Sequence, residues 1–387
     1  MPPPTQKSII KKPFVTALVV LLIIFAIVYF QQQRSPSSSS SPGSLSEKTV
    51  NEKDEKASRY SQAPDFAGIA HWINTEPLTM AQLRGKVVLV DFWTYTCINC
   101  LRTLPYLKMW HEKYHDQGLV IVGVHTPEFE FEKTYDNVLK FVNEHQIKYP
   151  VAQDNEYATW TAYHNRNWPH EYLIDSDGYI RHDHIGEGNY EETEARIQQL
   201  LSERMIELNQ TMKPNMTIQK PEAVVDVDFY NVYTPEIYLG YQTTRGNLGF
   251  LEHIQPDVVV NYTSSRVPII NQVSLEGLWK NNPDNVELAG DEGTVVLVFK
   301  AKVANIVAGS EQGSNLVVSL DNKVEDLTNK GADVVVSNSS GSISSARVAF
   351  VHDFKLYNVA AAPDYGTSTL KLHVVGKGFK LYTFTFG

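Results

Sequence analysis

The stretch "KVVLVDFWTYTCINC" at residues 86–100 joins an apolar run to the only two cysteines of the 387-residue chain, Cys97 and Cys100. Its first half is almost continuously apolar, as expected of a strand that is buried on both faces of a sheet. A disulfide between the two cysteines would close so small a loop that it would add little to folding stability. The C-x-x-C pair is therefore expected to be present for its chemistry.

The residues around the pair favour redox chemistry. A helical pattern runs from Cys97 to about Gln117, and the backbone N–H groups at a helix start stabilise a thiolate, which is the nucleophilic form of cysteine. Cys100 lies one turn inside the helix, where it can resolve a mixed disulfide. Asp91 lies in the apolar strand, so we expect a partly buried carboxyl group with a raised pKa that moves protons for Cys100. An ordinary acid at the strand edge is the alternative.

Metal binding is another use of two cysteines. A tetrahedral zinc site needs about two more soft ligands, and only histidines are left to supply them, because the chain has no second cysteine pair. His182 and His184 in "HDH" share one face of an expected strand and could ligate a metal together. No third ligand is evident, so surface histidines on a hairpin are the favoured interpretation. We expect no bound cofactor and no metal.

Residues 62–205 alternate between strand and helix patterns. A second buried strand is expected at 119–126 and an amphipathic helix at 132–145. Residues 171–186 have the pattern of a hairpin, and 190–205 that of a closing amphipathic helix with acids in its first turn. This order predicts an α/β domain with a central sheet and helices on both faces.

The segments "APDF" (63–66) and "EPLTMAQLRGKVVLVDFWTYTCINC" (76–100) resemble the TlpA/ResA branch of the thioredoxin superfamily. The resemblance covers about residues 62–202 and implies a thioredoxin-like fold and a redox-active cysteine pair. It also implies a cis-proline beside that pair, for which Pro169 in "NWPHEYLID" is the candidate; a trans proline at a strand entry is the alternative. Asp91 falls where thioredoxins carry their buried acid.

"TYTCINC" (94–100) and "GVHTPEFEFE" (123–132) are similar to the extracytoplasmic part of DipZ-type proteins. Glu128 falls near a buried glutamate of the TlpA/ResA branch, so it is a second proton-relay candidate, and a solvated loop acid is the alternative. Thr96 stands where this branch usually carries Trp. The substrate and the redox potential therefore do not follow from the resemblance.

The N-terminus predicts a single transmembrane anchor. "FVTALVVLLIIFAIVYF" at 14–30 carries no charge and is just long enough to span a bilayer. Lys7, Lys11 and Lys12 precede it; by the positive-inside rule, residues 1–13 then form a cytoplasmic tail, and the C-terminal domains lie outside, in the periplasm or on the cell surface. A cleaved signal peptide is the alternative, but no A-x-A cleavage site follows the apolar run.

Residues 31–61 are rich in Ser and Pro and then in charge, which predicts a flexible linker that holds the first domain away from the membrane. The outer compartment tends to oxidise thiols, so the cysteine pair would stay a disulfide there unless a partner reduces it. DipZ-type proteins often carry a multi-helix, CcdA-like electron channel in the same chain. With a single expected span here, a separate CcdA-like membrane protein is the expected electron donor.

After a second linker at 206–222, residues 223–387 lack long helical periodicity, which predicts an all-β sandwich. Strand patterns lie at 294–303, 315–321, 332–337, 368–376 and 379–387. "TPEIYLGY" and the terminal "YTFTFG" resemble the C-terminal domain of DipZ-type proteins, which implies a jelly roll similar to carbohydrate-binding modules. Tyr238, Tyr241 and Trp279 could stack on a glycan, but aromatic residues mostly fill the cores of such domains, and packing is the favoured interpretation.

Two functions from different classes are consistent with these patterns. The first is a membrane-anchored thiol–disulfide oxidoreductase that acts on protein disulfides or thiols through Cys97 and Cys100. The second is a cell-surface protein that binds glycans or proteins, with a redox-inert thioredoxin-like platform. A net charge of −10, with no Lys/Arg stripe, argues against a nucleic-acid partner.

Overall fold

The computed structural model describes residues 55–210, 215–222, 224–243, 254–263, 268–321, 329–337 and 345–387. The expected cytoplasmic tail and membrane span, residues 1–30, lie outside the described residues, as does most of the first linker. Within the described ranges no helix combines the length and the apolar character that a membrane crossing requires. Residues Arg59–Gly387 form one compact unit.

A six-stranded sheet with the order β1-β4-β3-β2-β5-β6 forms the first half of this unit. Its strands are β1 (His71–Ile73), β2 (Val87–Trp93), β3 (Leu119–His125), β4 (Val151–Gln153), β5 (His170–Ile174) and β6 (Ile180–Ile185). The strand β2 is buried along its whole length because it lies inside the sheet, parallel to β3 and antiparallel to β5. The apolar run expected from the sequence is thus a central strand.

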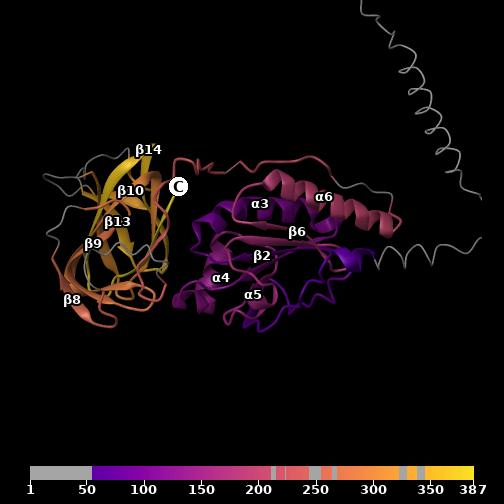
Figure 1. Cartoon of the computed structure of the whole chain (residues 1–387), viewed down its shortest axis with the longest axis horizontal. Coiled ribbons are helices and arrows are strands. Elements are labelled where there is room, and N and C mark those ends of the chain that lie inside the picture. The colour runs from indigo at the N-terminus through magenta and orange to yellow at the C-terminus, as the bar shows by residue number, and fades with distance from the viewer. Residues whose placement is uncertain are drawn as a thin grey trace, which may run out of the picture. The chain divides into compact units, whose positions relative to one another are not determined.

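Helices lie on both faces of this sheet (Figure 1). They are α3 (Ile98–Tyr114), α4 (Tyr135–Glu144), α5 (Ala158–Ala162) and α6 (Tyr190–Glu207), with short 3-10 turns η1 (His115–Gln117) and η2 (Glu130–Lys133). Side chains alternate along β2, so Leu89 packs with α3 and α6, whereas Val88 and Val90 face the opposite core. The resulting domain has the thioredoxin-like arrangement that the sequence predicted.

The predicted helices and the hairpin are present with shifted ends. The largest shift concerns the helix expected at 132–145, which is divided into η2 and α4. Thr134 separates the two with an extended backbone, φ −71° and ψ 116°. This interruption places the loop after β3 beside the cysteine pair, as described below.

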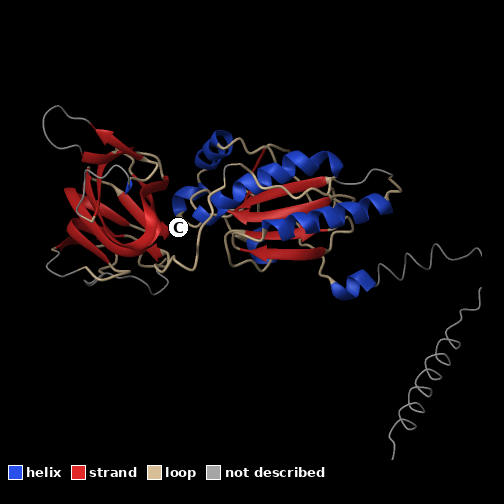
Figure 2. Cartoon of the chain, turned by 90° about the horizontal axis from the view of Figure 1, so that it is seen from above, coloured by secondary structure: helices blue, strands red, loops and turns tan. Residues whose placement is uncertain are grey.

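Figure 2 shows that the C-terminal half of the unit consists almost entirely of strands and loops. Its strands are β7 (Ile237–Tyr238), β8 (Val259–Tyr262), β9 (Val273–Asn281), β10 (Val286–Gly309), β11 (Ser314–Leu320), β12 (Val334–Ser337), β13 (Ser345–Val351), β14 (Lys355–Val375) and β15 (Lys380–Phe386). They pair in the order β12-β13-β11-β14-β10-β15-β7, with β9 also pairing to β10 and β8 to β9. We call this part the C-terminal domain.

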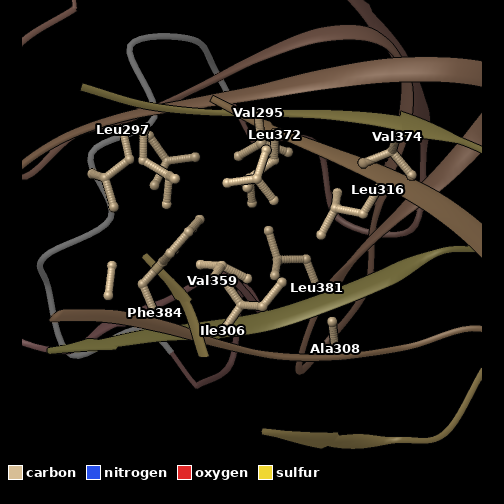
Figure 3. Packing of buried hydrophobic residues seen from close by; sticks show 14 of the residues in the cluster. Val295, Leu297, Ile306, Ala308, Leu316, Val359, Leu372, Val374, Leu381 and Phe384 are labelled. Carbon is tan, nitrogen blue, oxygen red and sulfur yellow. The ribbon is translucent and has the colours of Figure 1, made fainter. Parts of the chain in front are cut away.

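The C-terminal domain folds one sheet back on itself. The long strands β10 and β14 pair along most of their length, with register shifts near Ala301 and Ala304 that bend the pair. The first half of β10 contributes Val295 and the second half Ile306 to the same core, between two layers of strands (Figure 3). The sequence predicted an all-β sandwich; two layers are present, but the described strands that form them belong to a single nine-stranded sheet. The long bent strands account for the difference because each belongs to both layers.

Candidate redox site

The cysteine pair lies at the start of α3. Cys97 is the N-cap residue, and its Sγ accepts a hydrogen bond from the backbone N–H of Cys100 at 3.3 Å. Both cysteines are free thiols; Cys97 is half-buried and Cys100 is buried. Burial, the neighbouring Cys97 and the carboxyl group of Asp91 together raise the pKa of Cys100 well above its usual value. Cys97 is therefore the accessible sulfur, and Cys100 holds its proton.

Asp91 lies behind the pair, on β2. Its side chain is 2% exposed, and its Oδ1 has no hydrogen-bond partner among the described residues. Burial raises the pKa of Asp91 to about 7, because a charged carboxylate is disfavoured away from water. A carboxyl group with such a pKa can both take up and release a proton near neutral pH.

Pro169 lies on the segment that leads into β5. The peptide bond between Trp168 and Pro169 is cis. The indole Nε1 of Trp168 donates a hydrogen bond to the carbonyl oxygen of Thr126 at 3.0 Å. Trp168 lines the same cavity as Cys97, so this segment lies beside the accessible sulfur.

Glu128 lies on the wall of that cavity rather than in the protein interior. Its side chain is half-buried, and its carboxylate accepts a hydrogen bond from the hydroxyl of Tyr238 at 2.7 Å. Tyr238 belongs to β7, in the C-terminal domain, and also donates toward Glu236 at 3.2 Å. The relay role expected for Glu128 stays a prediction. Because Glu128 lines the cavity beside Cys97, a substrate that enters this cavity would contact its side chain.

The deeply buried acid of the same loop is Glu132, which the sequence did not single out. Glu132 is 0% exposed and accepts hydrogen bonds from the hydroxyl of Thr96 and from the backbone N–H of Phe129 at 3.0 Å. Burial raises the pKa of Glu132, although these hydrogen bonds oppose the rise. Glu132 thus connects the loop after β3 to the residue that directly precedes Cys97.

A second buried acid, Glu171 on β5, lies opposite Asp91 in the antiparallel pair of β2 and β5. Glu171 is 2% exposed; the Thr193 hydroxyl lies near its carboxyl group and lowers its pKa, but within the described part of the chain neither carboxyl oxygen has a well-aligned hydrogen bond. Burial, and then the charge of Asp91, raise the pKa of Glu171 well above its usual value. Its only sequence signal is an acid inside a strand pattern, and its approach to Asp91 depends on strand pairing.

The cavity beside Cys97 has a volume of about 240 Å³, which is below the roughly 300–1,000 Å³ of clefts that hold drug-sized ligands. Both domains line it, with Thr96, Cys97, Asn99, Glu128, Arg166, Asn167, Trp168, Glu236, Tyr238, Thr383 and Thr385. The floor is the redox site, and β7 and β15 supply the opposite wall. This space suits the side chain of a single cysteine and its immediate neighbours.

The sequence also offered candidate residues for binding a glycan and a metal ion. Of the three aromatic residues considered for a glycan, Tyr238 and Trp279 are 3% and 0% exposed, and Tyr241 donates a hydrogen bond to Asp257. Among the residues that the structure describes, no group of three or more His, Cys, Asp or Glu side chains is placed to hold a metal ion.

Comparisons with known proteins agree with this geometry. Residues 60–183 match the AhpC/TSA family, and residues 234–387 match a family described as thioredoxin-like C-terminal domain. The protein DipZ of Mycobacterium tuberculosis is 35% identical over 330 residues, which are 84% of this chain and 43% of DipZ. The chain thus spans less than half the length of that relative.

Shorter relatives match the first domain alone. The thiol-disulfide oxidoreductase YkuV of Bacillus subtilis is 32% identical over 141 residues, 36% of this chain and 94% of YkuV. The thiol-disulfide oxidoreductase ResA of Bacillus cereus is 29% identical over 146 residues, 38% of this chain and 80% of ResA. The sheet, the cysteine pair and these matches lead to one assignment: the chain belongs to the thioredoxin superfamily, as an enzyme related to the thiol-disulfide oxidoreductases.

Proposed function

We propose that the protein exchanges or reduces protein disulfides outside the cytoplasmic membrane, with Cys97 as the nucleophile and Cys100 as the resolving cysteine. One observation carries this proposal: a half-buried Cys97 accepts a hydrogen bond at the start of α3, while Cys100 is buried near Asp91, which it needs for proton transfer. A thiol pair kept for structure alone would have no use for an unpaired buried acid behind it.

The reaction proceeds in two exchanges. The Cys97 thiolate attacks one sulfur of the substrate disulfide; the substrate's S–S bond breaks, and the departing thiolate takes a proton from water. Asp91 then accepts the proton of Cys100, and the Cys100 thiolate attacks Sγ of Cys97. This step forms the Cys97–Cys100 disulfide and releases the second substrate sulfur, so two electrons have passed from the protein to the substrate. The reverse sequence oxidises a substrate dithiol.

Membrane anchoring and electron supply are part of the proposal. The apolar run at 14–30 and the basic residues before it support an anchored chain whose two domains lie outside. A protein that reduces disulfides there must be re-reduced, and a separate CcdA-like membrane protein would be a suitable donor.

The location can be tested with a single reporter thiol. In a chain carrying Cys97→Ser and Cys100→Ser, a Ser46→Cys substitution in the linker provides the only thiol. A membrane-impermeant maleimide should label it in intact cells. Labelling only after lysis would place the linker in the cytoplasm and contradict the anchored orientation.

The redox function is tested by trapping. A Cys100→Ser variant should accumulate mixed disulfides on Cys97, visible on non-reducing gels, because the resolving thiol is gone. The wild type should reduce insulin in the presence of dithiothreitol. The proposal fails if no adduct forms and the wild type leaves insulin intact.

The alternative function, glycan binding by a jelly-roll C-terminal domain, has less support. Trp279 packs inside the C-terminal domain and Tyr238 packs against Phe129 of the first domain, so neither can offer a flat ring to a sugar without rearrangement. Specific binding of the full chain on a glycan array, lost in a Tyr241→Ala variant, would support glycan binding by the C-terminal domain.

A further inference from the structure

Three titratable side chains form a row across the sheet of the first domain. Asp91 on β2 lies directly opposite Glu171 on β5, and Glu171 lies directly opposite His184 on β6. Directly opposed residues of antiparallel strands point to the same face, with Cβ atoms about 5 Å apart. The row therefore leads from the acid behind Cys100 to the edge of the sheet.

Several buried polar atoms of the row form no hydrogen bond with any residue that the structure describes. These atoms are Oδ1 of Asp91, both carboxyl oxygens of Glu171 and Nε2 of His184. The Thr193 hydroxyl on α6 lies near Glu171 and lowers its pKa, but it forms no well-aligned hydrogen bond with either oxygen. A buried polar group without a hydrogen bond lowers the stability of the folded state, so a row of such groups needs an explanation. Groups that exchange protons with one another, or with water between them, provide one.

Burial decreases along the row. Asp91 and Glu171 are each 2% exposed, whereas His184 is half-buried on the outermost strand of the sheet. The interior end of the row faces Cys100, and its outer end is accessible to solvent. Asp91 is buried too deeply to exchange protons with bulk water by itself.

We propose that Glu171 and His184 form a proton path that connects Asp91 with solvent. The inference rests on the proposed redox function, in which Asp91 receives the proton of Cys100 during resolution. Glu171 and His184 act through Asp91 and touch neither sulfur, so they are positioning residues for proton transfer. In this proposal the second histidine of the "HDH" motif, His184, takes part in proton transfer.

The transfer balances without a further reactant. Asp91 passes its proton, through a water between them, to one carboxyl oxygen of Glu171, and Glu171 passes the proton on its other oxygen, again through water, to the imidazole of His184. His184 then releases a proton to water, so that each of the three groups returns to its starting state. When the disulfide is reduced, a proton enters by the same steps in reverse.

Other titratable groups face this row and share its electrostatics. Cys100 on α3 and Tyr149 before β4 face Asp91, and Tyr190 on α6 faces Glu171. Around His184 and the first turns of α6 lie His170, His182, Asp183, Glu187, Glu192 and Arg196. A pH profile must therefore be compared between variants rather than assigned to one group in the wild type.

The chain offers a matched control on the same strand. His182 lies on the same face of β6 as His184, but its opposite residue on β5 is Leu173, so it stands beside the row and not in it. A Glu171→Gln substitution keeps the shape and removes the exchangeable carboxyl proton. A His184→Gln substitution interrupts the outer end, and His182→Gln removes an equivalent imidazole that the path does not use.

The test measures the single-turnover rate at which the reduced full chain reduces insulin, in H₂O and D₂O, across pH. Glu171→Gln and His184→Gln should each slow the reaction about tenfold or more, which is less than the full effect of a general acid or base because both residues act through Asp91. Their solvent isotope effect should exceed that of the wild type, and added imidazole should restore the His184→Gln rate. His182→Gln should stay within about twofold of the wild type.

The path is contradicted if either Glu171→Gln or His184→Gln keeps the wild-type rate and pH profile. A slow His184→Gln that imidazole does not restore would also contradict it, because a structural defect would then explain the loss. If Glu171→Gln fails to fold, the rate of His184→Gln still tests the path, because His184 is only half-buried and its substitution should be tolerated. An inactive wild type would instead overturn the proposed function, so the two failures are distinguishable.

Discussion

The two domains treat buried polar groups in opposite ways. In the described residues every buried Asp, Glu and His lies in the thioredoxin-like domain: Asp91, His125, Glu132, Asp154, His170, Glu171, Asp175 and Glu194. The buried polar residues of the C-terminal domain are all Asn, Ser or Thr. Burying an ionisable group lowers stability unless the group is paired. Glu194 and Asp175 form ion pairs with Lys113 and Arg181, whereas Asp91, behind the cysteine pair, has a raised pKa of the kind found at functional sites. The comparison assigns the reaction to the first domain and a packing and shaping role to the second.

The largest expected effect concerns the nucleophile. A Cys97→Ser substitution should lower insulin reduction by at least about a thousandfold, because the hydroxyl is a far weaker nucleophile than a thiolate. Circular dichroism and the urea midpoint of the variant should match the wild type, which separates lost chemistry from lost folding. Substantial residual activity in the variant would show that the reaction does not depend on Cys97, and the difference between the two domains would then not reflect catalysis.

The core of the C-terminal domain should affect stability without affecting chemistry. Leu372 is 0% exposed in the core shown in Figure 3, and Leu372→Ala should lower the free energy of unfolding by about 2–5 kcal/mol. Urea unfolding measures this change, with Leu278→Ala, at a 42% exposed position, as the control. The activity of the folded fraction should stay within about twofold of the wild type, and a larger loss would give the C-terminal core a part in catalysis.

Asp91 should lower stability as the pH rises. The pKa of Asp91 is raised by burial from 3.8 to about 7, so the folded state holds a proton that the unfolded state has lost between these values. The stability of the wild type should therefore fall as the pH rises from about 4 to about 7, by on the order of 4 kcal/mol from this group. The unfolding free energy of Asp91→Asn should lack that decrease, so the variant should be the more stable protein at pH 8 and the slower enzyme. Equal pH dependence in both proteins would show that Asp91 titrates normally.

The smallest effect should come from the cavity wall. Tyr238→Phe removes the hydroxyl that donates to Glu128 at 2.7 Å, at a cost of about 1 kcal/mol. The KM for insulin should rise severalfold, whereas the rate with dithiothreitol, a small reductant, should not change. Tyr241→Phe, which removes a hydroxyl bonded to Asp257 outside the cavity, is the matched control. Identical KM values for the two variants would show that Tyr238 of the C-terminal domain does not contribute to substrate binding.

Local patterns predicted the features that depend on neighbours in the sequence. Asp91 could be identified because it lies in an apolar strand at a fixed distance before Cys97. Glu171 and His184 could not, since their approach to Asp91 arises from the pairing of β2, β5 and β6. Glu132 was hidden in a run of alternating acids, and only its burial distinguishes it from Glu130.

The lengths of β10 and β14 were missed for a related reason. "AGDEGT" at 289–294 and "AAAPDYGTS" at 360–368 look like turns in the sequence, yet both lie inside long strands. The long strands β10 and β14 pair with each other at the ends of these segments, at 292–294 and at 360–361 and 366–368, so tertiary pairing outweighs local propensity. The sequence therefore predicted several short strands in place of these two long ones.

The central claim is that the buried acids of the thioredoxin-like domain serve the cysteine pair, and its most direct test is the pH profile of single-turnover insulin reduction by the wild type and by Asp91→Asn. The pKa of Asp91, raised to about 7 by burial, should give the wild-type profile an inflection near neutral pH that the variant lacks, together with a rate at least about tenfold lower in the variant. Superimposable profiles would contradict the claim and leave the thiol pair working without the acid behind it.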